Sequence, residues 1–284
     1  MTRPRQPEAG VILINVLVAL ALGAAIVVLM FTSQETLMDR TRRAAAATQA
    51  EALALGAEAS LVAALRRDMV EAPEVDHFAE PWAAAAQEEV VLATGRFSVS
   101  VSDVRGRFDL NSLALGGLAQ QQIFVRLTTA LGLADRVAVT VIEALLRSGP
   151  VQALSDIPGL DEAEKEALAP HVSLLPTRAP LNVNTAEETA LAAVIGTLSG
   201  ARQLLKLREK EGFLSKDALA DAGIVQSGGI GFASDAFDVT SRAEVDGTTV
   251  TLRSRILRHS DLGTSVVVVT SRRFGKTDAD KPAR

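Results

Sequence analysis

The chain has 284 residues, of which 48% are hydrophobic and 22% charged, with a formal net charge of −5 and no cysteine. This length and composition allow a membrane segment followed by one large or two modest domains, and they argue against a disordered chain. The acidic balance excludes a globally basic surface for nucleic acids, and the lack of thiols excludes disulfides, zinc-thiolate sites and cysteine nucleophiles.

A predominantly apolar run extends from Val11 to Phe31, behind a short leader that contains Arg3 and Arg5. A helix of this length spans about 30 Å, the hydrocarbon thickness of a bilayer, and the leader arginines favour a cytoplasmic N-terminus. A secretory signal has its small-residue cleavage site after the apolar core, whereas here Gly10 stands before it. Cleavage at Gly10 would leave the apolar helix on the mature protein, as in prepilin-like precursors. From the apolar run alone, an ordinary signal anchor is the alternative.

The helix is expected to continue through residues 32–70, which contain no proline and one glycine, and to end before Pro73. Apolar residues recur there at four-residue steps and predict one buried stripe, made of Leu53, Ala57, Leu61 and Leu65. Charged positions such as Glu58 lie off this stripe.

Alternation of apolar and polar residues predicts antiparallel strands at 96–103 and 237–245. Asp246 and Gly247 then predict a hairpin into a strand at 249–258, and residues 264–273 predict another. The polar end from Gly275 onward is expected to fray. Because the partners of 96–103 lie so far along the chain, residues 110–235, with their helical periodicity, are predicted to be an insertion.

Two segments of this insertion resemble helix-hairpin-helix units. The first spans residues 157–170, and the second spans 181–211 with a turn at 196–200 between two helices. Thr185 is expected to cap the first helix of the second unit, with Glu188 completing a capping box.

The order of several segments carries a resemblance to one family: the Gly10–Val11 junction, the non-acidic Asn15, the segments at 106–111, 157–159 and 181–186, and the strand-rich end. Over nearly its full length the chain resembles the minor pseudopilin K family of the type II secretion system, also called general secretion pathway protein K. The resemblance implies an α+β, pilin-like fold. In that fold a long N-terminal helical spine packs on a small antiparallel sheet, and a large α-helical domain with helix-hairpin-helix-like units is inserted.

The domain division that follows is a prepilin-type leader at 1–10, the transmembrane part of the N-terminal helix at 11–31, the periplasmic part of the spine helix at 32–70, pilin-like strands at 71–109, the helical inserted domain at 110–235 and the C-terminal strands at 236–284. The resemblance also implies a single-pass protein of the bacterial inner membrane, with a cytoplasmic N-terminus and the bulk of the chain in the periplasm.

The function implied is that of a subunit at the tip of the pseudopilus, which starts assembly with minor pseudopilins I and J and supports secretion across the outer membrane. The other implied partners are the major pseudopilin, the inner-membrane assembly platform and the prepilin peptidase. By resemblance the peptidase cuts between Gly10 and Val11, and the new amine of Val11 is a site for N-methylation. Glu8 departs from the basic leader of the family.

Asn15 occupies the fifth mature position, where most pseudopilins carry a glutamate that neutralises the N-terminal ammonium of the subunit ahead. An unpaired carboxylate in lipid costs at least ~2.5 kcal/mol. A tip subunit has no subunit ahead of it, so asparagine fits that place. The alternative reading is that Asn15 is only a tolerated hydrogen bonder between helices.

A membrane-anchored helix-hairpin-helix DNA receptor is the alternative from another class, since such hairpins bind phosphate at a helix N-terminus. Residues 156–166 hold five acids against Lys165, which repels a duplex. In the second unit Glu209 and Glu211 interleave with the cations, as on a solvated helix face; those cations are Arg202, Lys206, Arg208 and Lys210. We therefore expect no nucleic-acid partner.

No enzymatic motif is present, and the three histidines are scattered without metal-ligand spacing, so we expect no enzyme and no required cofactor. By resemblance, some family members bind calcium in the helical domain. The candidates here are Asp156, Asp161, Glu162 and Glu164, although they lack the regular spacing of a calcium loop.

Overall fold

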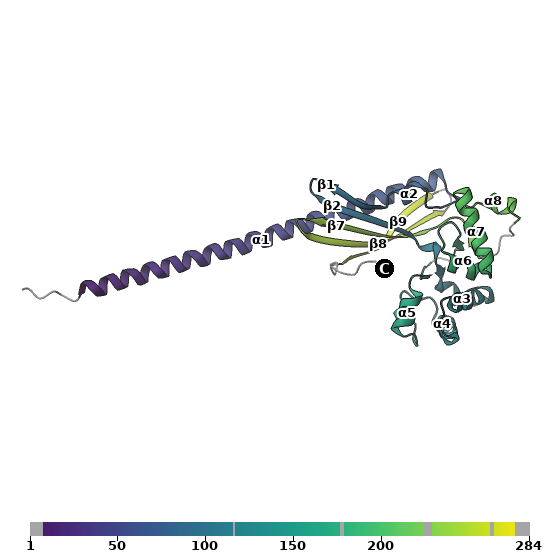
Figure 1. Ribbon diagram of the computed structural model, residues 1–284, viewed down its shortest axis with the longest axis horizontal. Helices are drawn as coiled ribbons and strands as arrows, with labels where there is room; N and C mark the ends of the chain where they lie inside the picture. Colours follow the sequence, from purple (N-terminus) through teal and green to yellow (C-terminus); the bar gives the residue numbers. More distant parts are fainter. Residues whose placement is uncertain (1–7, 116, 177–178, 224–228, 262–263, 276–284) are drawn as a thin grey trace, which may run out of the picture.

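The computed structural model describes residues 8–115, 117–176, 179–223, 229–261 and 264–275. It has three parts: a long helix, an antiparallel sheet against the second half of that helix, and a group of shorter helices at the far end (Figure 1). Helix α1 (Glu8–Glu71) runs from the N-terminal end of the molecule to the sheet. The single long helix predicted from the sequence is confirmed, and it ends just before Pro73.

The sheet has the strand order β1-β2-β7-β8-β9 in the described residues, with every neighbouring pair antiparallel. Its strands are β1 (Gln87–Leu92), β2 (Gly95–Asp103), β7 (Ala236–Val245), β8 (Thr248–Asp261) and β9 (Thr264–Gly275). Strand β2 pairs with β7 from Arg96 opposite Glu244 to Asp103 opposite Phe237. The predicted pairing across a long insertion is therefore confirmed. Sequence reasoning missed β1, whose polar and exposed residues give no alternating pattern.

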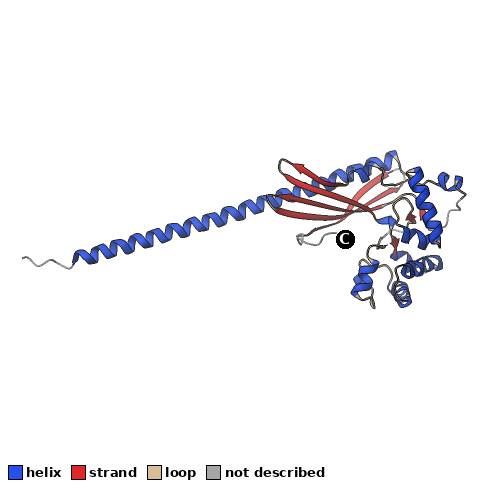
Figure 2. Ribbon diagram, in the orientation of Figure 1, coloured by secondary structure: helices blue, strands red, loops and turns tan. Residues whose placement is uncertain are grey.

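The spine helix packs on one face of the sheet (Figure 2). Leu61 and Leu65 are fully buried against Trp82, which precedes the sheet in the chain, and against Phe237 and other sheet residues, while the rest of the predicted stripe is partly buried. Further toward the N-terminus the contact is made by small side chains, namely Ala46, Ala50 and Ala54, which meet Ala243, Val245 and Leu252. Alanines allow the helix to approach the strands closely, and this places the backbone of α1 near β7 and β8.

Glu58 differs from the sequence prediction for the spine. The apolar spacing predicts that it lies off the buried stripe, yet it is only 2% exposed. Ser254 donates a hydrogen bond to it, and Arg272 donates from Nη2 to Oε1 at 2.7 Å. The stripe was read from apolar residues alone, and a carboxylate that meets a hydroxyl and a guanidinium across the interface can share the buried face.

The inserted segment folds into what we call the helical lobe, Leu110–Gly231, with a core of its own around Phe124, Leu127 and Leu145. Its helices are α3 (Leu118–Ala130), α4 (Asp135–Ser148), α5 (Glu162–Leu168), α6 (Glu188–Ile195), α7 (Leu198–Glu211) and α8 (Lys216–Asp221), with the 3₁₀ turns η2 (Leu110–Leu115) and η3 (Leu154–Asp156). The lobe lies at the end of the molecule away from the N-terminus (Figure 1).

Short connecting elements join the lobe to the rest of the chain. Helix α2 (Pro81–Ala84) follows the spine, and the 3₁₀ turn η1 (Val104–Gly106) follows β2. Two parallel strand pairs, which the sequence did not predict, tie segments distant in the chain: β3 (Phe108–Asp109) with β4 (Val172–Ser173), and β5 (Leu181–Asn182) with β6 (Ile230–Gly231). Two-residue strands carry no periodic signal, so only the tertiary structure reveals them.

The predicted cap at Thr185 is wrong. Helix α6 begins at Glu188 with Glu187 as its N-cap, and no side chain caps it. The Thr185 hydroxyl donates instead to Asp103 at 2.5 Å, because a buried carboxylate needs donors more than the exposed helix end does. A capping box forms at α5, between Asp161 and Glu164.

Candidate functional site

The N-terminal part of α1 carries the residues predicted for processing and assembly. Its apolar side chains from Ile12 to Phe31 are exposed, and the described helix is long and apolar enough to cross a membrane, with a mean hydropathy of 2.9 in its most apolar window. Gly10 and Val11 lie within the helix, and Asn15 is exposed on its shaft. This end of the protein is thus an exposed apolar helix that fits single-pass anchoring in a membrane.

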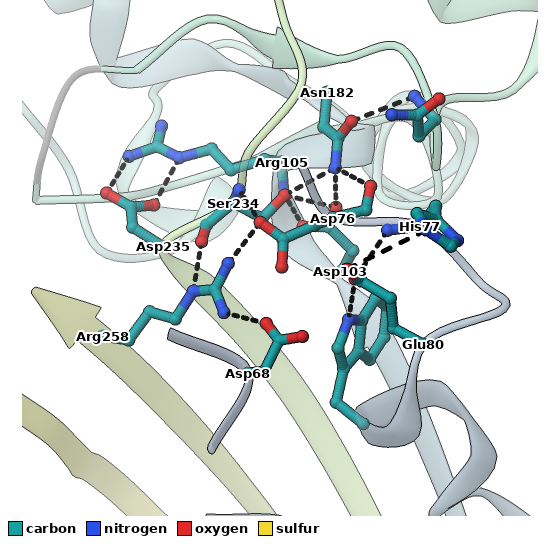
Figure 3. A network of polar contacts seen from close by, with 12 residues as sticks. Asp68, Asp76, His77, Glu80, Asp103, Arg105, Asn182, Ser234, Asp235 and Arg258 are labelled. Carbon is teal, nitrogen blue, oxygen red and sulfur yellow. Dashed lines mark hydrogen bonds and ion pairs between the residues drawn. The ribbon is translucent and has the colours of Figure 1, made fainter. Parts of the chain in front are cut away.

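A second site lies at the opposite end of the spine, where α1, the sheet and the helical lobe meet. We call it the junction cluster and define it as Asp68, Asp76, Glu80, Asp103, Asn182, Ser234 and Arg258 (Figure 3). All seven residues are buried. The sequence pattern did not predict this cluster.

Asp103 joins the sheet to the lobe. It ends β2, and its carboxylate accepts hydrogen bonds from Asn182 Nδ2 at 3.0 Å and from the hydroxyls of Thr185 and Ser234 at 2.5 Å. The main-chain amide of Arg105 also donates to it. Burial raises the pKa of Asp103, and these hydrogen bonds oppose that rise. Donors from several chain segments therefore converge on one carboxylate, which fixes how the lobe joins the sheet.

Asn182 extends the same network to the loop after the spine. Its Nδ2 lies 3.0 Å from the main-chain oxygen of Asp76 and 2.9 Å from Ser234 Oγ, while its Oδ1 accepts from the amide of Asn184. Asn184 in turn bonds both main-chain groups of Leu214. The polar residues of this segment thus form buried hydrogen bonds that hold neighbouring segments together. Their alternation with buried Leu181 and Val183 was the one sequence signal that could have indicated this role.

Arg258 is the cation of the junction cluster. Its Nη1 donates to Asp68 at 2.5 Å, its Nη2 to Asp76, and its Nε to the main-chain oxygen of Ser234 at 2.6 Å. The guanidinium carbon also lies 5.2 Å from the centroid of the Phe237 ring. The guanidinium thereby links strand β8 to the last turn of the spine and to the loop that follows it.

The carboxylates around Arg258 are crowded. Burial raises the pKa of Asp76 to about 7, with Arg258 opposing the rise and the charges of Asp68 and Glu80 adding to it. Burial also raises the pKa of Glu80, against hydrogen bonds from the His77 amide and from Trp82 Nε1. Both pKa values are therefore raised mainly by burial, and the neighbouring negative charges add to the rise.

Glu58 and Arg272 form a further polar link between the spine and the edge strand β9. Burial would raise the pKa of Glu58, but hydrogen bonds from Arg272 and Ser254 outweigh it and hold that pKa below its ordinary value. The carboxylate therefore stays ionised and attaches the spine to the sheet.

The four acids predicted as calcium candidates have partners within the protein, and two of them share one capping box. Asp156 caps η3 by accepting from the amides of Gln152 and Ala153. Asp161 and Glu164 form the capping box of α5, and Glu162 pairs with Lys165. In the part of the chain that the structure describes, they do not gather into a group of three oxygens within 4.8 Å; Asp68, Asp76 and Glu80 do. These four residues thus do not fit a shared cation site.

The second helix-hairpin-helix-like unit consists of α6, its turn and α7, and three of its cations, Arg202, Arg208 and Lys210, have partners in the protein. Arg208 is half-buried and donates to the main-chain oxygens of Val183 and Ala186, and Arg202 pairs with Glu188. At the turn, Thr197 accepts from the amide of Gly200, which occupies a donor that a phosphate would need. The geometry fits a structural hairpin.

The spine, sheet and inserted lobe together define the class of protein: a pilin-like subunit with an α+β fold, whose N-terminal apolar helix fits a membrane anchor. A family model for protein K of the type II secretion system matches residues 181–240. The type II secretion system protein K of Pseudomonas aeruginosa is 30% identical over 253 residues, which cover 75% of this chain and 76% of that protein. The protein of the same name from Klebsiella pneumoniae is 28% identical over 263 residues, covering 75% and 80%.

The chain belongs to the type II secretion system protein K family. Its fold matches a chain in the crystal structure of the GspK-GspI-GspJ complex from enterotoxigenic Escherichia coli, with a TM-score of 0.67 and 23% identity. That match covers 84% of this chain and all of the other. The pilin-like fold with an inserted helical domain, predicted from the sequence, is confirmed.

Proposed function

We propose that this protein is the minor pseudopilin at the tip of the type II pseudopilus, where it starts assembly with minor pseudopilins I and J and supports secretion across the outer membrane. It acts as a structural subunit, with the major pseudopilin, the assembly platform and the prepilin peptidase as its other partners. The E. coli structure, whose chain shares this fold, is a complex of GspK with GspI and GspJ, and this supports the choice of partners.

The observation that carries the proposal is the position of the helical lobe. It lies at the end of the spine opposite the N-terminus (Figure 1). In a filament built from parallel spines, a subunit ahead of this one would have to place its spine alongside that end. The lobe would occupy the space that this spine needs, so the protein fits a position with no subunit ahead of it.

Asn15 supports the same place. As the fifth residue after Gly10 it carries no charge, and a tip subunit needs none because no ammonium lies ahead of it. Residues 1–10 would be the leader and 11–31 the span of the inner membrane, with a cytoplasmic N-terminus. Residues 32–109 and 236–284 would form the pilin-like domain in the periplasm, and 110–235 the insertion.

Co-purification of the full chain with minor pseudopilins I and J from detergent-solubilised membranes tests the function, with duplex DNA binding measured beside it at moderate salt. We expect a stoichiometric complex with I and J and no DNA binding. Salt-sensitive DNA binding without a pseudopilin complex would show that the protein is a DNA receptor instead.

The role of Asn15 is tested by Asn15→Glu, with Asn15→Gln as the uncharged control. The glutamate would be left unpaired in lipid at a cost of at least ~2.5 kcal/mol, so we expect fewer pseudopili and less secretion from Asn15→Glu alone. Equal pseudopilus counts in both variants would contradict the argument. Mass spectrometry of the mature protein should find Val11 as the first residue, with its amine methylated.

A further inference from the structure

Three carboxylates from consecutive segments meet within the junction cluster. Asp68 lies in the last turn of α1, Asp76 in the loop that follows, and Glu80 at the N-cap of α2. One oxygen from each lies within 4.8 Å of the other two. Ca²⁺ binds oxygen at about 2.3–2.6 Å, so its ligands can be about 5 Å apart, whereas Mg²⁺ at about 2.0–2.1 Å needs a tighter set. We propose that these three residues form a binding site for a hard divalent cation, with Ca²⁺ as the best match.

A second observation at Asp76 points to a ligand. The side chain is fully buried, and its Oδ2 accepts from the Ser234 amide at 2.6 Å and from Arg258. Its Oδ1 is buried without a hydrogen-bond partner. In Figure 3 this oxygen faces the gap between Asp68 and Glu80. Burying a carboxylate oxygen without a partner costs free energy, and a cation in that gap would remove the cost.

The negative charge left uncompensated at the site matches that of a divalent cation. Arg258 contacts Asp68 and Asp76 and supplies one positive charge, which leaves two of the three negative charges uncompensated when all three carboxyls are ionised. His77 Nε2 lies 3.9 Å from Glu80 Oε1 and adds charge only when protonated. A divalent cation supplies the missing two charges, and a donor set made of oxygen selects a hard cation.

The position of the site indicates what a bound cation would do to the structure. It lies outside the helical lobe, whereas the calcium sites that the family resemblance implies lie inside that lobe. The site joins the end of the spine to the loop that holds the lobe through Asn182 and Ser234. A bound cation would therefore fix the orientation of the helical lobe on the spine.

Trp82 makes the proposal directly measurable. It is the only tryptophan, the chain has no tyrosine, and its Nε1 lies 2.7 Å from Glu80 Oε2. Excitation of this tryptophan should sensitise the luminescence of Tb³⁺, a probe for Ca²⁺ sites, only when the ion is bound close by. The experiment is a Tb³⁺ titration of the detergent-solubilised full chain after chelation, followed by displacement with CaCl₂.

Glu80→Gln is the test variant because glutamine still accepts from Trp82 and the His77 amide, and Glu162→Gln, an exposed carboxylate on α5, is the matched control. We expect sensitised emission that CaCl₂ displaces in the wild type and in Glu162→Gln, and at least tenfold weaker binding in Glu80→Gln. Asp76→Asn should show the same loss and replaces Glu80→Gln if the tryptophan emission maximum of the latter indicates unfolding. Wild-type emission that is absent or not displaced by CaCl₂, or that survives both substitutions unchanged, would overturn the proposal.

Discussion

Replacing Arg258 with methionine is expected to destabilise the protein more than any exposed substitution. Methionine fills much of the space of the arginine stem, so the main loss is electrostatic. The change leaves Asp68 and Asp76 without their cation and removes the contact with the Phe237 ring. Breaking a buried ion pair by removing one partner costs about 3–5 kcal/mol, and a largely buried cation–π contact adds about 1–2 kcal/mol. We therefore expect a loss of about 4–7 kcal/mol in the free energy of unfolding.

Urea unfolding of the detergent-solubilised full chain, followed by the fluorescence of Trp82, measures this loss in the presence of a chelator. Arg253→Met is the matched control, because Arg253 lies on the same strand and is exposed. Exposed substitutions change stability by about 0.5 kcal/mol or less. In addition, Asp68→Asn should recover part of the loss when combined with Arg258→Met, since it removes an unpaired charge. Equal costs for the two arginine variants, or no recovery, would refute this account of the junction cluster.

Three further predictions concern other parts of the structure. Burial raises the pKa of Asp109 to about 6, so the native state binds its proton more tightly than the unfolded state does. This residue therefore makes the free energy of unfolding fall as pH rises from about 4 to about 6. Asp109→Asn should flatten that pH dependence in urea titrations, and an unchanged slope would contradict the assignment. Gly95→Ala should lower the urea midpoint, because φ is +154° and the new Cβ would lie 2.3 Å from the Glu244 carbonyl oxygen. Gly56→Ala on the spine is the contrasting variant: its new Cβ would meet nothing within 4 Å, so it should raise the free energy of unfolding by up to ~1 kcal/mol. Asn182→Ala removes donors from buried acceptors and should cost about 1–3 kcal/mol by the same assay; a cost within error of zero would show that the asparagine does not join the lobe to the sheet.

Periodicity predicted the elements whose burial repeats along the chain. The spine helix follows from a long stretch without proline and from apolar residues at helical spacing, and the strands from alternation on either side of the Asp246–Gly247 turn. The insertion followed from topology, because a strand at 96–103 had no partner nearby. Local signals of this kind suffice where each residue's environment is determined by its own element.

What the sequence by itself determined was therefore the apolar N-terminal helix, the spine, four of the five strands of the large sheet and the family, all of which depend on local pattern or on the order of short segments. Only the tertiary structure decided the junction cluster, because Arg258 meets Asp68 across 190 positions of the chain and no spacing rule connects them. It also decided that Glu58 is buried and that Thr185 serves Asp103 rather than its own helix. The physical reason is common to these cases: a buried charge takes its partners from whatever segment the fold brings near. Its pairing therefore depends on the tertiary structure and cannot be predicted from the local sequence.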